Sequence, residues 1–126
     1  MISPYSTDYF PAAPTIEVNL GLPYETFRNG LLLAFVDTGA DATIVPTRYL
    51  VELDAPIDNH KYARSQWGER RMVDIYVLDI GIGDSRILSV ETIGDASGEE
   101  IVLGRDVLNK LILTLNGPNQ FLELRA

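Results

Sequence analysis

Three consecutive residues in the first third of the chain, Asp37, Thr38 and Gly39, could support acid–base chemistry. They follow directly on residues 31–36, all of which are apolar. A six-residue apolar run that ends in a turn signal predicts a buried strand. A carboxyl group at the end of such a strand is costly to ionise unless hydrogen-bond donors surround it or it shares a proton. We therefore interpret Asp37 as one half of a catalytic carboxylate pair. The simpler alternative is a capped turn at the end of a strand.

The residues after Asp37 favour a tightly turned loop. Gly39 allows the backbone to turn sharply and to approach a neighbouring segment closely. The hydroxyl group of Thr38 can hold such a loop by hydrogen bonding. The three residues together are the candidate catalytic loop, and the surrounding chain must supply the strands that position it.

Most of the chain has the pattern of short strands. Residues 15–20 alternate with a period of two, which is typical of a half-buried strand. Residues 24–27 could form a short strand before the turn signal Asn29-Gly30, which would make residues 31–36 the second arm of that hairpin. Thr47 is the expected cap of a helix over residues 47–53. The remaining expected elements are a short helix over residues 106–111 and strands at 43–46, 72–78, on both sides of a turn at 81–85, and at 101–103, 111–115 and 120–124.

Residues 61–78 predict a hairpin with its tip at residues 65–69. Gly68 is the only glycine in this stretch and marks the turn. Trp67, the only tryptophan of the chain, would lie near the tip. An exposed tryptophan commonly marks a contact site. The alternative is a ring that packs on the surface of its own domain.

A second motif lies near the end of the chain, where apolar residues 101–103 lead into Gly104, Arg105 and Asp106. The Asp-Thr-Gly-Ala sequence at residues 37–40, with Asp41 and Thr43 after it, resembles the active-site loop of retropepsins, the retroviral branch of the aspartic proteases. Retropepsins open their single helix with an apolar-apolar-Gly-Arg-Asn/Asp segment, which residues 102–106 resemble. The resemblance extends over roughly residues 15–124, with the expected hairpin between the two motifs, where retropepsins have the flap that closes over substrate.

The resemblance implies an all-β fold: a closed, barrel-like acid protease fold with a flap hairpin and one short C-terminal helix. It implies that Asp41 pairs with Arg105 of its own chain, the alternative being two unrelated surface charges. It assigns catalysis to Asp37, Thr38 and Gly39, and structural support to Gly104, Arg105 and Asp106. The substrate-binding residues that it implies are Ala40, Asp41, Ala42, Ser65, Gln66, Trp67 and Gly68.

Peptide hydrolysis by this route needs two carboxyl groups that share one proton, because two like charges a few ångströms apart cannot both ionise. The chain has a single Asp-Thr-Gly, and 126 residues cannot hold two lobes of this kind. We therefore expect a homodimer in which a two-fold axis brings Asp37 beside its symmetry mate. The resemblance implies that Thr38 bonds across this axis and that Gly39 lies under the substrate backbone. The alternative is a catalytically silent peptide-binding or dimerisation module.

Several positions depart from the retropepsin pattern. Ala40 cannot donate a hydrogen bond to the Asp37 carboxylate as a serine or threonine could, so we expect an optimum from weakly acidic toward neutral pH. Ala42 replaces a second acid that many retroviral members carry, which changes a wall of the expected substrate pocket. The flap has one glycine where retropepsins have a glycine-rich tip.

The composition is that of one ordinary globular domain, with 126 residues of which 46% are hydrophobic. We expect an extended arm over residues 1–14, which contains three prolines, and the protease domain over residues 15–126. The net charge of −8 argues against nucleic acid or an anionic membrane as a partner. A polypeptide substrate is what the resemblance implies. There is no cysteine, no signal-peptide pattern and no apolar run of about 20 residues, so a cytoplasmic protein is expected. No metal or cofactor is implied, and His60 is expected to be a loop residue.

Overall fold

The computed structural model describes residues 1–64 and 68–125. Short strands make up most of the chain, and two helices of six and four residues interrupt them. The elements in chain order are β1 (Ile2–Pro4), β2 (Thr15–Gly21), β3 (Leu32–Val36), β4 (Ile44–Pro46), α1 (Thr47–Glu52), β5 (Asn59–Arg64), β6 (Arg70–Ile82), β7 (Ser85–Asp95), β8 (Ile101–Leu103), α2 (Arg105–Leu108), β9 (Ile112–Asn116) and β10 (Phe121–Arg125).

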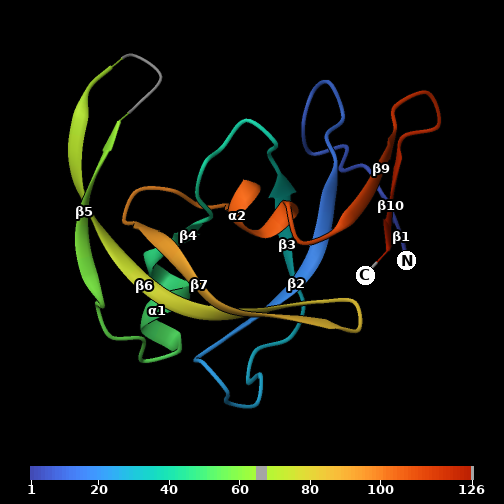
Figure 1. The fold of residues 1–126 in the computed structure, drawn as a ribbon. Coiled ribbons are helices and arrows are strands. Elements are labelled where there is room, and N and C mark those ends of the chain that lie inside the picture. Colours follow the sequence, from blue (N-terminus) through green and yellow to red (C-terminus); the bar gives the residue numbers. More distant parts are fainter. Residues whose placement is uncertain (65–67, 126) are drawn as a thin grey trace.

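Six strands close into a barrel in the order β2-β3-β8-β4-β7-β6, because β6 pairs back onto β2 (Figure 1). The β3–β8 and β4–β7 pairs are parallel, and β2–β3 and β6–β7 are antiparallel. The first half of β6 leaves the barrel and pairs with β5, which forms the expected flap hairpin. The all-β, closed-barrel fold class expected from the sequence is confirmed.

The barrel interior is filled by aliphatic side chains that alternate along the strands. Ile16, Val18 and Leu20 of β2 are buried, and Glu17 between them is exposed, as the period of two predicts. Burial of each such side chain is worth roughly 1.5–3 kcal/mol. The largest fully buried side chains are Ile16, Leu20, Leu50, Leu53, Leu78, Ile80, Ile82, Ile101, Leu103 and Leu122.

The two ends of the chain form a separate three-stranded sheet in the order β1-β10-β9 (Figure 1). The Met1 amino group donates to the Leu124 carbonyl oxygen over 3.0 Å, and Ile2 pairs opposite Glu123. Part of the expected extended arm is therefore a strand that pairs with its own chain. The division of the chain into an arm over residues 1–14 and a domain over 15–126 stays a prediction.

The prediction of a hairpin at Asn29-Gly30 is wrong, because its expected first strand is absent. Residues 24–27 form no strand, and β3 pairs with β2 across a longer connection. The physical reason is the ring of Phe27, which packs against the strands: a Cβ atom added at Gly21 or Gly81 would lie 2.8 Å from it. This close approach draws the segment onto β2 and β6 and away from a tight hairpin.

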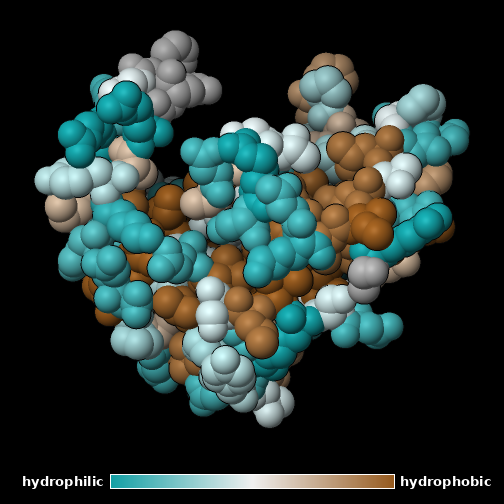
Figure 2. Space-filling view, in the orientation of Figure 1, coloured by the Kyte–Doolittle hydropathy of each residue, from teal (hydrophilic) through white to brown (hydrophobic). Residues whose placement is uncertain are grey.

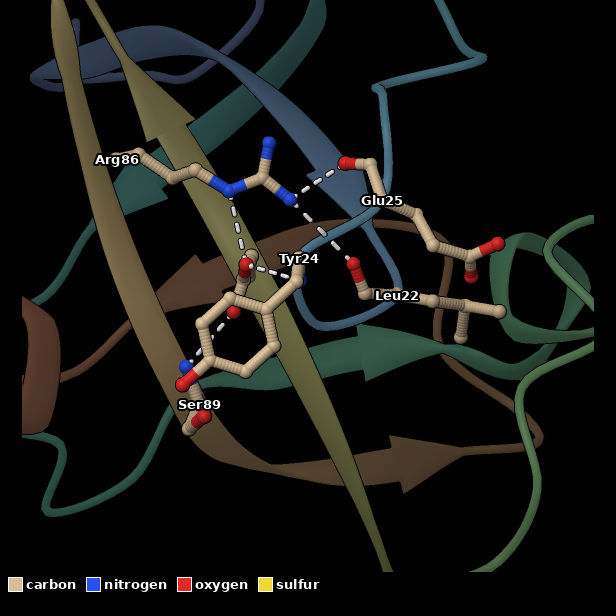
Figure 3. Close-up of polar contacts among 6 residues, drawn as sticks. Leu22, Tyr24, Glu25, Arg86 and Ser89 are labelled. Carbon is tan, nitrogen blue, oxygen red and sulfur yellow. Dashed lines mark hydrogen bonds and ion pairs between the residues drawn. The ribbon is translucent and has the colours of Figure 1, made fainter.

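A buried carboxylate also holds this segment, through hydrogen bonds (Figure 3). Asp79, fully buried, accepts hydrogen bonds from the backbone N–H groups of Tyr24 at 2.9 Å and Ser89 at 2.8 Å, and from Arg86 Nε at 2.8 Å. Burial alone would raise the pKa of Asp79, but these donors and the Arg86 charge outweigh it and hold the pKa below its ordinary value. Arg86 also donates to the Glu25 carbonyl oxygen over 2.5 Å.

Three further expectations about element bounds are corrected. Residues 72–78 and the strand after them are one strand, β6, with a register irregularity between Leu78 and Ile80 where the Asp79 side chain turns inward. Thr47 is the first residue of α1 and not its cap; Pro46 holds the cap position without a side-chain hydrogen bond. The second helix spans Arg105–Leu108 and is shorter than predicted.

No helix among residues 1–64 and 68–125 is long and apolar enough to cross a membrane.

Candidate active site

The loop that carries Asp37 begins at the end of β3, beside the parallel strand β8. The Asp37 N–H donates to the Leu103 carbonyl oxygen over 3.0 Å, which continues the ladder between these strands by one residue. The backbone then turns, and the Ala40 N–H donates to the Asp37 carbonyl oxygen over 3.2 Å. The apolar run does form a strand, β3, that leads Asp37 into the loop, but the prediction of a fully buried strand is wrong: Ala34 and Val36 are buried, whereas Leu31 and Leu33 are exposed.

The Asp37 carboxylate has one donor from its own loop. The Gly39 N–H donates to Asp37 Oδ1 over 2.9 Å, and this bond fixes one oxygen of the carboxylate. A Cβ atom at residue 39 would lie 3.2 Å from that oxygen, so a side chain there would crowd the carboxylate. Asp37 is half-buried, whereas Thr38 and Gly39 are exposed in the single chain.

Arg105, the first residue of helix α2, fixes the loop through hydrogen bonds and an ion pair. The Arg105 N–H donates to the Ala40 carbonyl oxygen over 2.8 Å, and Arg105 Nη1 donates to the Thr38 carbonyl oxygen over 2.9 Å. The Arg105 guanidinium also forms an ion pair with Asp41. The pairing that the resemblance implies between Asp41 and Arg105 is thus present, and these two residues are not unrelated surface charges.

A second network ties the loop to α2 through a buried threonine. Thr43 Oγ1 donates to Asp106 Oδ1 over 2.7 Å and accepts from the Gly104 N–H over 3.1 Å. The Thr43 N–H donates to Asp106 Oδ2 over 3.1 Å. A supporting role for Thr43 was missed in the sequence, although a hydroxyl residue at the end of the loop, followed by apolar Ile44 and Val45, was an available signal.

Gly104 is required by the close packing of two backbones. A Cβ atom there would lie 2.6 Å from the carbonyl carbon and oxygen of Ala42 and 3.0 Å from the Ala40 oxygen. Its backbone torsions are ordinary for any residue, so space and not conformation demands the glycine. The Gly-Arg-Asp segment therefore supports the loop in three ways. Gly104 leaves space for the loop backbone, Arg105 forms an ion pair with Asp41, and Asp106 accepts a hydrogen bond from Thr43.

A groove of about 710 Å3 lies between this loop and the flap hairpin, and Figure 2 shows the hollow with hydrophobic surface on its floor. Gly39 forms its end nearest the Asp37 carboxylate. Aliphatic side chains from β4, β6 and β7 form much of the floor, and charged residues lie around it. The residues that line it are Gly39, Ala40, Asp41, Ala42, Ile44, Lys61, Tyr62, Ala63, Arg64, Val73, Ile75, Glu91 and Ile93.

The predicted substrate-binding residues fall into two groups. Ala40, Asp41 and Ala42 all line the groove. Gly68 is exposed near the end of the hairpin with a φ angle of +84°, a conformation that suits glycine in a turn. Ser65, Gln66 and Trp67 lie outside the described residues. Within residues 1–64 and 68–125, no group of three or more acidic or histidine side chains converges in a way that could hold a metal ion.

Solved structures with a similar fold are retropepsin-like proteins. A retropepsin-like aspartic protease from Rickettsia conorii superposes with a TM-score of 0.66 at 16% identity, over 100% of this chain and 92% of that one. The EIAV protease in complex with the inhibitor HBY-793 gives 0.59 at 18% identity, over 86% and 93%. The retroviral protease-like domain of Ddi1 from Leishmania major gives 0.52 at 16% identity, over 88% of each chain. No protein-family model matches this sequence, and no curated protein matches it significantly by sequence.

Proposed function

We propose that this chain, whose fold is that of the retropepsin-like aspartic proteases, works as a homodimeric aspartic endopeptidase. The observation that carries the proposal is the Asp37 carboxylate, oriented by the N–H of Gly39, a residue that lines a large groove. A strand that merely ended in a capped turn would not need a groove beside it, or contacts from both Arg105 and Thr43 to fix its loop.

The dimer supplies the second carboxyl group. Each chain brings one Asp37, and the exposed Thr38 and Gly39 leave the loop open to a second copy. A two-fold axis beside Asp37 would place two identical carboxyl groups together, as an isologous contact requires. Thr38 is the residue that we expect to bond across this axis, because its hydroxyl can both donate and accept.

The proposed reaction moves protons between the two carboxyl groups, a water molecule and the peptide. The ionised carboxyl group takes a proton from the water, whose oxygen attacks the peptide carbon, while the protonated one donates to the carbonyl oxygen. The tetrahedral intermediate collapses and the C–N bond breaks: the leaving nitrogen receives a proton from one carboxyl group, and a hydroxyl of the intermediate gives its proton to the other, which restores the singly protonated pair. The two apparent pKa values belong to the pair and not to either residue.

The groove is the proposed binding site for the polypeptide substrate. Ala40 and Ala42 leave room beside the loop, and the aliphatic floor favours an apolar side chain. Lys61 pairs with Glu91 at 2.5 Å, so two of the charges around the groove already compensate each other. The flap residues Ser65, Gln66, Trp67 and Gly68 complete the proposed site, and a cytoplasmic location stays a prediction.

The test compares two aspartates with the same local geometry. Asp95 also ends a strand and accepts a hydrogen bond from the N–H two residues on, at 3.1 Å. The residue that donates to Asp37, Gly39, lines the groove, whereas Ser97, which donates to Asp95, does not. We expect Asp37→Asn to abolish cleavage of a peptide library at every pH and Asp95→Asn to leave it unchanged, with both variants folded. A statine-type inhibitor is expected to block the parent. If Asp37→Asn cleaves as well as the parent, the proposal is wrong.

A catalytically silent peptide-binding module is the second candidate, and the groove itself favours it, because binding needs a cavity but no dyad. This candidate predicts that peptides from the library bind the parent and Asp37→Asn equally and that neither protein cleaves them. Binding measured in parallel with cleavage separates the two candidates.

A further inference from the structure

We infer that the loop between β1 and β2 is a contact to the second copy of the chain, with the Phe10 side chain as its anchor. This inference rests on the proposed function, because it uses the two-fold axis beside Asp37. It concerns residues 6–13, which lie outside the segment whose sequence motifs resemble retropepsins and which the sequence predicts only as part of an extended arm.

The loop is held rigidly although it is exposed. Ser6 and Ala13 pair across its base, with N–H···O distances of 2.8 and 3.1 Å in the two directions. The Asp8 N–H donates to Ser6 Oγ over 3.2 Å. The Tyr9 hydroxyl donates to the Glu100 carboxylate, and burial, helped by this acid, raises the pKa of Tyr9 to about 12. A loose terminus would have none of these contacts.

The rigid loop presents a large apolar side chain to solvent. Phe10 is fully exposed, and Figure 2 shows hydrophobic surface at the tip of this loop. A single exposed apolar residue is ordinary on a protein surface. An aromatic ring on a loop that is fixed by several hydrogen bonds differs from such a scattered residue. Ordering the loop has an entropic cost, and in the single chain the ring at its tip is fully exposed.

The position of the loop connects it to the proposed two-fold axis. The Tyr9 ring packs on Phe35 with their centroids 5.2 Å apart. Phe35 and Asp37 are two residues apart, which is about 7 Å along an extended backbone. In Figure 1 the loop between β1 and β2 and the loop between β3 and β4 rise from the same end of the barrel. A second copy that brings its Asp37 to this one would approach this end of the barrel, where the loop that carries Phe10 also lies.

The occupant that these observations favour is a second copy of the chain. Two-fold symmetry makes the contact occur twice, so each Phe10 inserts into the other subunit. A rigid aromatic side chain in the centre of a contact is the residue type that contributes most to binding. The loop thus supplies dimer affinity outside the catalytic residues, which leaves Thr38 and Gly39 free for their positions at the axis.

The first experiment measures the monomer–dimer equilibrium by sedimentation. We expect Phe10→Ala to raise the dissociation constant of the dimer by about tenfold to a hundredfold, the loss expected for one buried phenylalanine. The control is Tyr24→Ala, which removes an exposed ring from the connection between β2 and β3 and is expected to change the constant by less than about twofold. The thermal stability of Phe10→Ala is expected to match that of the parent, because Phe10 is exposed in the single chain.

The second experiment uses the absence of cysteine from the sequence. Phe10→Cys and Tyr24→Cys each introduce a single thiol. We expect the Phe10→Cys thiol to react at least about tenfold more slowly with a soluble thiol reagent in the dimer than at monomer concentrations, and the Tyr24→Cys thiol to react equally in both. Equal reactivity at position 10, together with unchanged dimerisation of Phe10→Ala, overturns the inference.

The outcomes separate this inference from the proposed function. If the parent is an active dimer and Phe10→Ala does not change the dissociation constant of the dimer, the loop contact is refuted and the proposed protease function is not. A dimer that depends on Phe10 while Asp37→Asn still cleaves peptides supports the contact and refutes the proposed catalysis. A parent chain that stays monomeric at every concentration refutes both.

Discussion

Removal of the Asp79 carboxylate tests how the barrel is held together on the side away from the groove. Asp79→Ala leaves the Tyr24 and Ser89 N–H groups without their acceptor and leaves the Arg86 guanidinium without its counter-ion. Loss of one partner of a buried pair costs about 3–5 kcal/mol. That is a large part of the roughly 5–15 kcal/mol that stabilises a domain of this kind. For 126 residues it corresponds to a fall in melting temperature of about 10–20 °C.

The assay is urea unfolding at neutral pH, with Asp84→Ala as control. Asp84 is exposed in the turn between β6 and β7, and its removal is expected to cost less than about 0.5 kcal/mol. A loss of less than about 1 kcal/mol for Asp79→Ala would refute the reasoning, because it would mean that water satisfies the freed donors.

The same residue predicts an acid dependence with a definite sign. The pKa of Asp79 is lower in the folded chain than its ordinary value of 3.8, so its contribution to stability is complete above that pH and is lost as the pH falls through the folded value. The difference in stability between the parent and Asp79→Ala should therefore shrink below about pH 4. A difference that stayed constant down to pH 2 would contradict this.

The remaining predictions concern the active-site loop. Gly104→Ala should destabilise the fold by about 1–3 kcal/mol in urea unfolding, because its methyl group would overlap the loop backbone. Thr43→Val should cost about 1–3 kcal/mol and lower kcat, because it removes the hydroxyl donor to Asp106 Oδ1 and leaves the buried Gly104 N–H without its acceptor; Thr43→Ser should restore most of both. Ala40→Ser should move the pH optimum of cleavage toward acid, since the new hydroxyl could donate to ionised Asp37, and an unchanged pH profile would contradict that geometry.

The strands and the two halves of the candidate site were predictable because local signals agree with the tertiary structure. Residues 15–20 alternate because one face of β2 is in the core. The run before Asp37 forms β3 between β2 and β8, with Ala34 and Val36 buried, and nothing in the single chain explains why the exposed Leu31 and Leu33 are apolar. The pairing of Asp41 with Arg105 followed from a resemblance that joins segments 64 residues apart. Periodicity alone does not place two such segments together.

The positions of Phe27 and Asp79 could not be predicted from the sequence, because they depend on contacts between segments that are distant in the chain. Phe27 lies in a stretch that reads as a strand, but two glycines on β2 and β6 make a site for its ring, and tertiary packing overrides the local preference. Asp79 interrupts an apolar run, which suggested a boundary between two strands. Its partners are 55 and 10 residues away in sequence, so no local pattern could identify it as a buried, fully bonded carboxylate.

One chain is enough to shape the loop that carries Asp37, but the proposed reaction needs two chains. Several contacts from within one chain shape the loop: the Leu103 carbonyl oxygen, the Arg105 backbone and side chain, and Asp106 through Thr43. We therefore expect the loop to keep this conformation in the single chain. The proposed chemistry needs what a single Asp-Thr-Gly cannot give, a second carboxyl group to share the proton. A chain built in this way would be folded but inactive as a monomer, and association alone would switch on the reaction.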